Sequence, residues 1–343
     1  MSRLRLRPAV VCVVLVLLLM AILSGCSSKT KSEPAPQANT STPEAKPFSP
    51  EGKTLLWVQP LKGHPVHQLT QIAFAEGAKK LGYKFEIIGT EQWDVQSTIA
   101  LVEAAMAKGA AGMVVWAGEP SFYPFIEKVS KNGISVFVPH FPIPEGTVPG
   151  LKGIVSADPA DYAKEVAIEI GKAINGKGTV AITQGSFNTT ENLVSETFKK
   201  TMNEKYPNVK VLPPQEEGFD PPKAIAKAVA ILQANPDIVA ALSTTGGGPT
   251  TWAGAQKDTG KKIVAVGMDY TRVNLDLVKN GEIFAVVGQP LWEESYAAAE
   301  LLDKTLRGEK PPYWTKLSAP FITKDKLAPY YSMLEKVEAA IKK

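Results

Sequence analysis

Cysteine is almost absent from this sequence. Its two cysteines, Cys12 and Cys26, both lie within the first 26 of 343 residues. From residue 27 onward the chain has no thiol and can form no disulfide, so its stability must come from a hydrophobic core. Chains beyond roughly 250–300 residues usually divide their core between domains, so we expect two domains.

An excess of charge is also missing once the N-terminal segment is set apart. The whole chain carries 38 basic and 34 acidic residues, but residues 1–25 hold three arginines and no acid. The remaining 318 residues therefore carry 35 basic against 34 acidic side chains. Such a near-neutral body is unlike the basic surfaces that bind phosphate backbones, so we do not expect nucleic acid as a partner.

The signatures of nucleotide and acyl-transfer sites are missing as well. The glycine run 246–248 has neither the Gly-Lys-Ser/Thr ending of a P-loop nor a dinucleotide fingerprint, and Pro249 at the start of a predicted helix accounts for it. The chain has no Gly-x-Ser-x-Gly elbow, and its three histidines have no evident serine or cysteine partner. We therefore predict that the protein is not an enzyme and needs no cofactor.

The one long apolar run lies near the start of the chain. Three arginines precede the run Ala9–Leu19, and the tetrapeptide Leu-Ser-Gly-Cys ends at Cys26. A charged start, a short apolar core and a small-residue exit are typical of a secretory signal. The tetrapeptide resembles the lipobox of bacterial lipoproteins, which implies cleavage before Cys26 and a diacylglycerol on its thiol. An uncleaved signal anchor is the alternative, because the run to Leu23 is almost long enough to span a bilayer.

The segment after the lipobox has little that could form a core. Residues 27–50 contain one aromatic residue and no aliphatic side chain larger than alanine. Such a segment cannot bury enough apolar surface to offset its ordering entropy. We predict a lipoprotein signal peptide over residues 1–25 and a lipidated, disordered tether over residues 26–52. An O-glycosylated stalk or an interaction motif is the alternative for the tether.

From Lys53 onward short apolar runs alternate with amphipathic stretches. The runs are rich in valine and isoleucine and predict strands over Thr54–Val58, Lys84–Ile88, Gly112–Trp116, Ser135–Val138, Gly178–Ile182, Val209–Leu212, Ile238–Leu242, Ile263–Val266 and Phe284–Val287. The stretches between them predict helices over His67–Leu81, Val95–Lys108, Ala160–Ile174, Glu191–Glu204 and Pro222–Ala234. Asp94 and Thr190 are the expected N-caps, and Gly82 and Gly109 the expected C-terminal stops. The predicted fold class is α/β, with two doubly wound, Rossmann-like lobes of parallel sheet.

In such folds ligands bind at the carboxyl ends of the strands. The predicted loops at those ends hold all three histidines and two of the six tryptophans of the chain. Polar and aromatic residues at or near these strand ends are the candidate binding residues: His64, His67, Trp116, His140, Phe141, Asn192, Phe219, Thr244, Asp269 and Gln289.

These residues also carry a family resemblance. From about Lys53 to Lys326 the chain resembles a type I periplasmic binding protein of the ribose/galactose class, whose fold is shared by the effector domains of the lactose-repressor family. The resemblance rests on Pro65 followed by a helix ending Lys-Leu-Gly-Tyr at Tyr83, on Val-Gly-Met-Asp ending at Asp269, and on Gln289 twenty residues later. Gly308-Glu309-Lys310 also lies where the family places a short turn.

The resemblance implies two lobes joined by a hinge of three crossing strands, with the ligand cleft between them. We expect one lobe from residues 53–156 plus 290–317 and the other from residues 157–289 plus 318–343. The crossings are expected near Ser156–Asp158, Gln289–Pro290 and Lys316–Ser318. Closure of the lobes on a ligand that touches both would shift the balance from open to closed states.

The resemblance also assigns roles to single residues. It places His64 and His67 where ribose binders use an asparagine and a phenylalanine, and it matches Phe219, Asp269 and Gln289 to residues that line the family's pocket. Trp116 or Val115 falls at an asparagine position, and Thr244 or Thr245 at another. His140-Phe141 replaces an Asp-Arg pair, and Asn192 replaces an arginine. The charges that hold ribose are therefore lost, and we do not expect a ribose receptor.

The candidate residues suit a small neutral sugar or polyol. Carboxylate, amide and hydroxyl groups pair with its hydroxyls, and aromatic rings cover its C–H faces. Four of these residues have other interpretations: Trp116, Phe141 and Phe219 can be core residues, and Asp269 can be a turn residue or an N-cap. The histidines could instead bind zinc, although no cysteine or flanking acid supports such a site.

The sequence thus predicts a lipid-anchored, monomeric receptor on the extracytoplasmic face of a cell membrane. By resemblance it would deliver its ligand to an ABC permease with its ATPase. A receptor that presents a signal such as an autoinducer to a sensor or chemoreceptor is the alternative, with a zinc receptor or an export-side enzyme less favoured. A lactose-repressor-type regulator is not expected, since the lipobox and tether precede the body where a DNA-binding headpiece would be needed.

Overall fold

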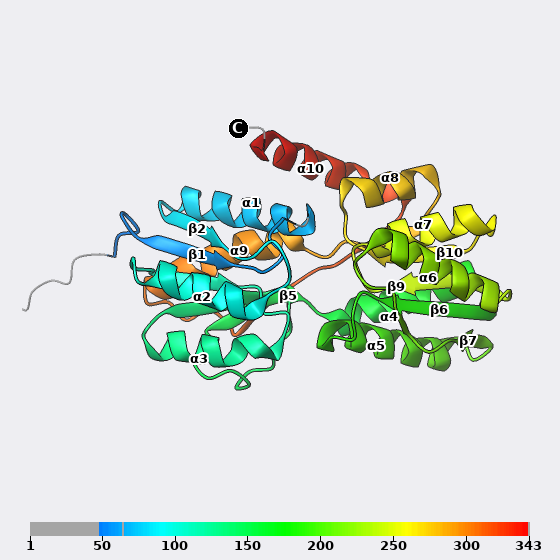
Figure 1. Ribbon diagram of the computed structural model, residues 1–343, viewed down its shortest axis with the longest axis horizontal. Helices are drawn as coiled ribbons and strands as arrows, with labels where there is room; N and C mark the ends of the chain where they lie inside the picture. The colour runs from blue at the N-terminus through cyan, green and yellow to red at the C-terminus, as the bar shows by residue number, and fades with distance from the viewer. Residues whose placement is uncertain (1–47, 64, 342–343) are drawn as a thin grey trace, which may run out of the picture. The chain divides into compact units, whose positions relative to one another are not determined.

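The computed structural model describes residues 48–63 and 65–341 (Figure 1). The signal peptide, Cys26 and the tether up to residue 47 lie outside the described residues, as does His64. Within the described ranges, no helix combines the length and the apolar character needed to cross a bilayer.

The first sheet contains six parallel strands in the order β12-β5-β4-β3-β1-β2 within the described chain. The strands are β1 (Thr54–Val58), β2 (Lys84–Ile88), β3 (Gly112–Val115), β4 (Ser135–Pro139), β5 (Gly153–Ala157) and β12 (Trp314–Leu317). One face packs against α1 (Pro65–Lys80) and α9 (Leu291–Leu306), and the other against α2 (Val95–Met106) and α3 (Tyr123–Lys131). Side chains alternate between these faces, so Leu55 and Trp57 belong to the first core and Leu56 and Val58 to the second.

The second sheet has the order β13-β11-β10-β9-β6-β7, with β8 also paired to β6. All its pairs are parallel except β13 with β11. Its strands are β6 (Gly178–Gln184), β7 (Val209–Val211), β8 (Gln215–Glu216), β9 (Ile238–Ser243), β10 (Val264–Met268), β11 (Ala285–Val287) and β13 (Phe321–Ile322). Helices α4 (Pro159–Ala173) and α5 (Thr189–Lys205) pack on one face, and α6 (Pro221–Ala234), α7 (Gly248–Thr259) and α8 (Arg272–Asn280) on the other.

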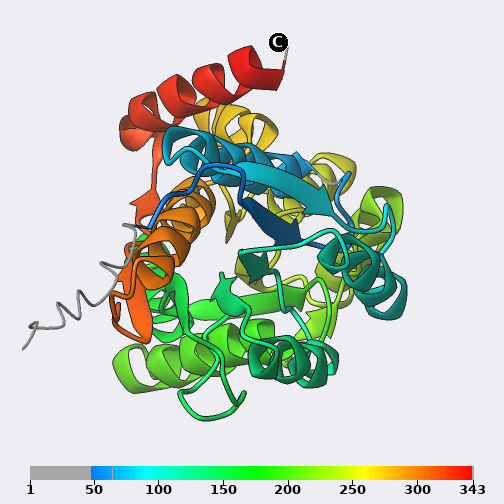
Figure 2. The ribbon, with the colours of Figure 1, turned by 90° about the vertical axis from the view of Figure 1, so that its left-hand side faces the viewer.

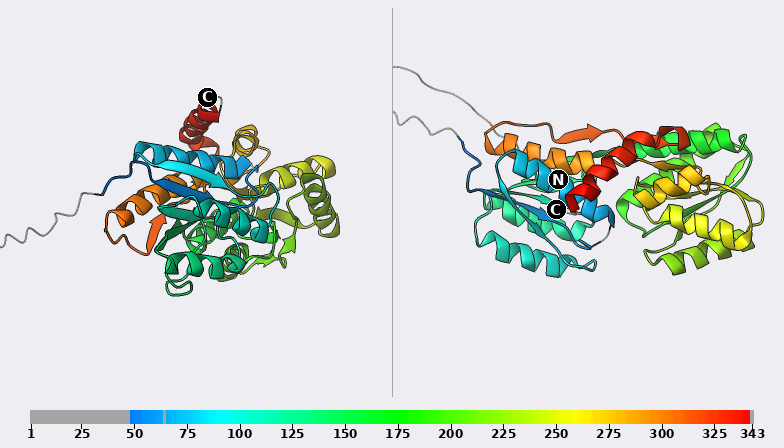
Figure 3. Two further views of the ribbon diagram at one scale, coloured as in Figure 1. Left: turned by 60° about the vertical axis from the view of Figure 1, so that its left-hand side comes forward. Right: turned by 90° about the horizontal axis from the view of Figure 1, so that it is seen from above.

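The chain passes between the two sheets three times. It leaves the first sheet after β5 to enter α4, returns after β11 to enter α9, and leaves again between β12 and β13. The last helix, α10 (Ala328–Ile341), then runs back over α1 while touching α8, as Figures 2 and 3 show in red. The exact lobe boundaries drawn from the sequence stay a prediction.

The structure confirms the predicted fold class, and each of the nine predicted strands overlaps an observed one. Asp94 caps α2, accepting a hydrogen bond of 2.9 Å from the Ser97 amide. Thr190 is wrong as the cap of α5, because Asn188 accepts from the Glu191 amide at 2.9 Å instead. The strands β5, β8, β12 and β13 and the helices α3, α8, α9 and α10 were not among the predicted ranges.

Candidate functional site: a cleft between the two sheets

A cavity of about 500 Å³ lies where strands of both sheets end. The first sheet's side contributes residues of α1 and of the loops after β2, β3 and β4, and the second sheet's side contributes residues after β6, β8, β9 and β10. Because parallel strands end at one edge of a sheet, residues distant in sequence meet there. Eight of the predicted site residues line this cavity: His67, Trp116, His140, Phe141, Phe219, Thr244, Asp269 and Gln289.

The other two predicted residues have different outcomes. His64 lies outside the described residues. Asn192 is not among the residues that line the cavity. Its amide oxygen instead accepts from Gln184 Nε2 at 3.1 Å, and its amide nitrogen donates to the Phe187 carbonyl at 3.4 Å. The expected ligand contact from Asn192 is therefore not supported, because neighbouring loop groups already bind its side chain.

Three of the cavity-lining residues have a backbone conformation that non-glycine residues rarely adopt. Leu61, His140 and Asp269 have φ angles of 58°, 71° and 71°. Each follows a strand, namely β1, β4 or β10. Such left-handed residues cost energy and persist where the surrounding structure imposes them, often at binding sites. At Asp269 the Asn274 side chain holds this turn, because its Nδ2 donates to the carbonyls of Met268 and Asp269 at 3.0 and 3.1 Å.

Trp116 is the centre of an aromatic cluster on the first sheet's side. Its ring stacks on the His140 imidazole with centroids 4.7 Å apart, and it meets the Phe141 ring edge-on at 5.5 Å. The His67 ring lies 5.3 Å away on another side. His67 Nδ1 in turn lies 2.9 Å from the Leu61 carbonyl oxygen, within hydrogen-bonding distance. These contacts fix an apolar wall suited to the face of a small ring.

Behind that wall a histidine–carboxylate pair is buried. His140 Nδ1 and Glu294 Oε1 are 3.0 Å apart, and the Glu294 side chain in α9 is fully buried. Burial disfavours the charged imidazole, but the Glu294 carboxylate, together with Asp269 and Glu191, outweighs burial and raises the pKa of His140 above its ordinary value. His140 is therefore held in one orientation, and the surrounding carboxylates stabilise its charged form.

The second sheet's side is lined by carboxylates that the sequence did not single out. Glu191, in the first turn of α5, accepts from Thr244 Oγ1 at 2.6 Å, from the Gly185 amide at 2.7 Å and from Asn188 Nδ2 at 2.8 Å. Glu217, just after β8, accepts through Oε1 from Ser243 Oγ and Thr251 Oγ1 at 3.2 and 3.3 Å. Glu191 was read as part of a helix, and Glu217 follows a two-residue strand without a detectable pattern.

Besides Glu294 Oε2, two buried carboxylate oxygens lack a hydrogen-bond partner among the described residues. They are Asp269 Oδ1 and Glu217 Oε2, on side chains that belong to residues only 5% exposed. Burial raises the pKa of both carboxyl groups to about 7. Gly246 allows the close approach to Asp269, since a Cβ there would lie 2.3 Å from Asp269 Oδ2. Packing thus explains Gly246, and also Gly248, where a Cβ would lie 2.0 Å from Ser243 Oγ, whereas a Cβ at Gly247 would meet nothing within 4 Å.

The connections between the sheets also reach the cavity. Gln289, in the crossing after β11, donates through Nε2 to the Tyr162 hydroxyl at 3.3 Å, and both residues line the cavity. At the neighbouring crossings, Lys316 of β12 pairs with Asp158 and Asp161 at 2.9 and 2.7 Å. Groups at the cleft and at the crossings are therefore in direct contact.

The mouth of the cavity carries exposed aromatic rings from both sides. Phe219 is 64% exposed and Trp93 is 40% exposed, although both line the cavity. Trp93 Nε1 donates to Glu119, which also lines it. Exposed rings at the rim of a cavity are available to cover a ligand, since large apolar side chains gain most from being removed from water.

A metal site and a second cavity are the alternatives to this cleft. In the described ranges, no group of three or more His, Cys, Asp or Glu side chains is arranged to hold a metal ion.

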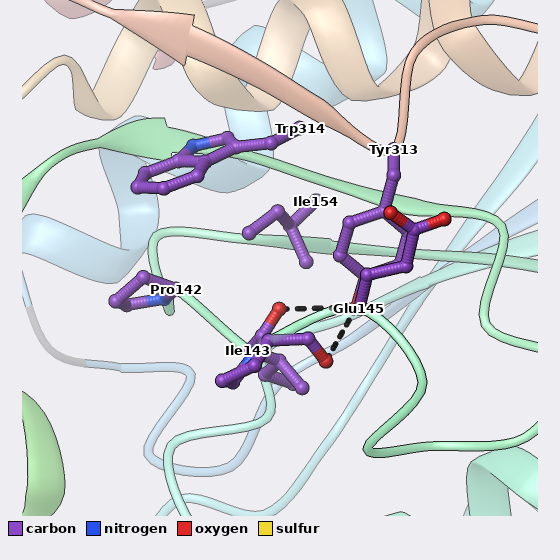
Figure 4. Close-up of a pocket in the computed structure, with 7 residues that line it drawn as sticks. Pro142, Ile143, Glu145, Ile154, Tyr313 and Trp314 are labelled. Atoms are coloured by element: carbon purple, nitrogen blue, oxygen red, sulfur yellow. Dashed lines mark hydrogen bonds between the residues drawn. The ribbon is translucent and has the colours of Figure 1, made fainter.

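A second cavity of about 470 Å³ lies on the first sheet's side, between the β4–β5 connection and β12 (Figure 4). There the Tyr313 hydroxyl donates to the Ile143 carbonyl at 3.0 Å, and Glu145 is the single acid of the lining. That cavity takes residues from one side alone, so the cleft is the stronger candidate.

Comparison with known proteins agrees with this architecture. A family model described as a periplasmic binding protein domain matches residues 56–310, and the chain belongs to this family. Among curated proteins, a D-apiose import binding protein of Actinobacillus succinogenes is 27% identical over 250 residues, which cover 68% of this chain and 77% of that protein.

Solved structures share the fold at low sequence identity. GanP, a glucose-galactose binding protein of Geobacillus stearothermophilus, superimposes with a TM-score of 0.75 at 22% identity, covering 81% of this chain and 99% of its own. AraP, an arabinose binding protein of the same organism, has a TM-score of 0.71 at 21% identity, covering 81% and 99%. The resemblance to type I periplasmic binding proteins is therefore confirmed.

Proposed function

We propose that this protein is a lipid-anchored, extracytoplasmic solute-binding receptor of an ABC importer, and that it captures a small sugar or polyol by closing its two lobes. The observation that carries the proposal is one cavity at the strand ends of both sheets, lined on one side by aromatic rings and on the other by carboxylates. This is the division of groups that a sugar requires, because it presents hydroxyls at its edge and C–H bonds on its faces.

The relatives support the same ligand class. The curated relative is named for the import of D-apiose, and a solved relative from Actinobacillus succinogenes, 20% identical with a TM-score of 0.73, holds D-allose. A single cavity shared by two lobes also gives the transport role its mechanism. A ligand that contacts both lobes in the closed state favours closure by its difference in affinity for the two states.

We propose the contacts as follows. Asp269 and Gln289 bind hydroxyls from the second sheet's side, with Thr244 beside them. Trp116 and Phe141 cover one face of the ligand, and Phe219 covers it from the opposite side. Because Gln289 lies in a crossing and hydrogen-bonds Tyr162 at 3.3 Å, a ligand that binds Gln289 acts on the hinge directly.

The anchor and the partner follow from the N-terminal segment. The lipobox ending at Cys26 supports attachment by a diacylglycerol, and the segment up to residue 47 would hold the receptor near a permease. In this role the protein binds its ligand without transforming it.

A thermal-shift screen of the purified full chain in mild detergent tests the proposal. The panel holds pentoses, hexoses and polyols, with nucleosides, autoinducers and zinc for comparison. We expect stabilisation by at least one sugar or polyol, and we expect Asp269→Ala to abolish it while the variant keeps its fold. Stabilisation by zinc alone, or an affinity unchanged in Asp269→Ala, would contradict the proposed site.

A further inference from the structure

The charges of the cleft are unbalanced. Among the described residues that line the cavity there are four carboxylates and no lysine or arginine. The carboxylates are Glu119, Glu191, Glu217 and Asp269. A site for a neutral ligand commonly offsets its buried acids with basic side chains, since an uncompensated buried charge is costly. Here the protein supplies little of that compensation itself.

The histidine at the cleft does not remove the imbalance. His140 contacts Glu294 at 3.0 Å, and Glu294 is a fifth carboxylate, fully buried behind the lining. A proton on His140 therefore offsets one negative charge among Glu294, Asp269 and Glu191. The carboxylates of the second sheet's side keep their own negative charge when they ionise.

Two of these carboxylates, those of Asp269 and Glu217, are also incompletely hydrogen-bonded. Glu191 has three partners, from Gly185, Asn188 and Thr244. By contrast, Asp269 Oδ1 and Glu217 Oε2 have none among the described residues, although both residues are 95% buried. Both residues line the cavity, so a bound molecule lies against them. The bond that such an oxygen makes best is to a charged N–H donor.

We propose that the ligand of this cleft carries a protonated amine, and so is an amino sugar or an amino-substituted polyol whose ammonium group takes the place of a hydroxyl at Asp269, while Glu217 adds negative charge to the same cavity. The inference rests on the proposed function, because it takes the cleft to be the site of a sugar-class ligand. A hydroxyl could donate to either oxygen, but it would leave the negative charge in place. An ammonium group supplies the donors and the compensating charge together.

The surroundings of the two acids suit a fixed cationic site. The turn of Asp269 is held by Asn274, and Gly246 lets the backbone approach its carboxylate. Glu217 is held by Ser243 and Thr251. The positions of the acceptors are thus set before the ligand arrives, which reduces the entropy lost on binding.

Calorimetric titration of the full chain in detergent at about pH 7.5 tests the inference with matched triples of ligands. Each triple holds an amino sugar, its parent sugar and its N-acetyl derivative, in the gluco, galacto and manno series, and aminopolyols are paired with their parent polyols. The N-acetyl form keeps the nitrogen and loses the charge. We expect the amino member of the best series to bind about tenfold or more tightly than either partner.

Isosteric variants assign the effect to the two carboxylates. Asp269→Asn and Glu217→Gln keep the size of each side chain and remove its charge, so each should reduce the preference for the amine several-fold. Glu145→Gln is the matched control, because Glu145 is an exposed acid in the other cavity, and it should leave the preference unchanged. The melting temperature of each variant without ligand shows whether it is folded. If one of the two variants does not fold, the other is enough for the test.

The outcomes separate the two proposals. Equal or tighter binding of the parent sugar would overturn the amine and leave the proposed function intact, and so restore the neutral ligand expected from the sequence. A preference for the amine that survives both substitutions would overturn its assignment to Asp269 and Glu217. Binding of no sugar, polyol or amino derivative would contradict the proposed function as well.

Discussion

Asp269 and Glu217 illustrate how position changes the chemistry of a carboxyl group. In water the pKa of such groups lies near 4, whereas burial raises the pKa of each to about 7. For Asp269 the buried Glu294 and Glu191 raise the pKa further, and His140 opposes them. At neutral pH both groups are therefore poised between their neutral and ionised forms, and a bound cation would favour ionisation.

The raised pKa values predict a pH-dependent cost in the protein without ligand. Between about pH 4 and pH 7 the folded state holds protons on Asp269 and Glu217 that the unfolded chain has lost, so the stability falls as the pH rises. Above about pH 7 this cost is constant. Asp269→Asn removes the ionisation, and we expect it to raise the free energy of unfolding by about 1–3 kcal/mol at pH 8.

Urea denaturation of the wild type and Asp269→Asn at pH 8 and pH 5 measures this effect. The stability gained by the variant at pH 8 should shrink toward pH 5, where the wild-type carboxyl is protonated. Glu145→Gln serves as the control, since an exposed acid should show no such gain. If the difference between wild type and Asp269→Asn is the same at both pH values, Asp269 does not ionise in the folded state as described.

At the scale of elements, the start of α5 connects stability to the cleft. The Asn188 side chain accepts from the Glu191 amide at 2.9 Å, and its Nδ2 donates to Glu191 Oε1 at 2.8 Å. This reciprocal pair satisfies a helix terminus and at the same time orients a carboxylate that lines the cavity. One residue of the loop after β6 thus has both a folding role and a positioning role.

Asn188→Ala should therefore lower the free energy of unfolding by about 1 kcal/mol, because the cap is lost. It should also weaken ligand binding, since Glu191 loses one of its three partners. Thr190→Ala in the same turn is the control for stability, and we expect it to change the unfolding free energy by less than about 0.5 kcal/mol. Chemical denaturation of both variants measures the difference, and equal losses would contradict the assignment of the cap to Asn188.

The elements also show where sequence reasoning succeeds and where it stops. The strands of both sheet interiors were predictable because buried parallel strands are near-continuous runs of valine and isoleucine. The cap of α5 was not, since Asn188, Thr189 and Thr190 are adjacent and each is a suitable N-cap. Strand β8 has two residues and no periodicity, so Glu217 at its end gave no signal. A glutamate in a predicted helix is expected to be exposed to solvent. Glu191 is buried because the loops after β6 and β9 pack around it.

The candidate site, like the fold, could be predicted from the sequence only in part. The topology alone placed Trp116, His140 and Asp269 at strand ends, and eight of the ten residues chosen from topology and family resemblance together line the cavity. Asn192 was chosen because it aligns with a position of the family, but side-chain direction in the first turns of α5 depends on local hydrogen bonds. The charge imbalance of the cleft could not be read from a near-neutral composition, because composition does not show which acids are buried together.

At the scale of the whole molecule, Cys26 ties the receptor to its place of action. We expect Cys26→Ser to move the exported protein from the membrane fraction to the soluble fraction, since a lipid chain is then absent. Ligand affinity should be unchanged, because every residue that lines the cavity lies beyond residue 60. Cell fractionation and the mass of the N-terminal peptide measure the anchor. A variant that stays in the membrane fraction would favour the uncleaved signal anchor.

For the molecule as a whole, we propose that the ligand binds between the two lobes and draws them together. The near absence of cysteine makes this directly measurable. Gln92 near Trp93 and Lys223 near Phe219 are exposed residues at opposite sides of the cavity mouth. Spin labels can be attached there through Gln92→Cys and Lys223→Cys in a full chain that carries Cys12→Ser and Cys26→Ser.

The decisive measurement is the distance between these two labels by pulsed electron paramagnetic resonance, with and without the sugar-class ligand that stabilises the protein most. Closure predicts that saturating ligand moves the distribution to shorter distances, and that Asp269→Asn at the same ligand concentration leaves more of it at the longer ones. A distribution that saturating ligand leaves unchanged would contradict capture by lobe closure.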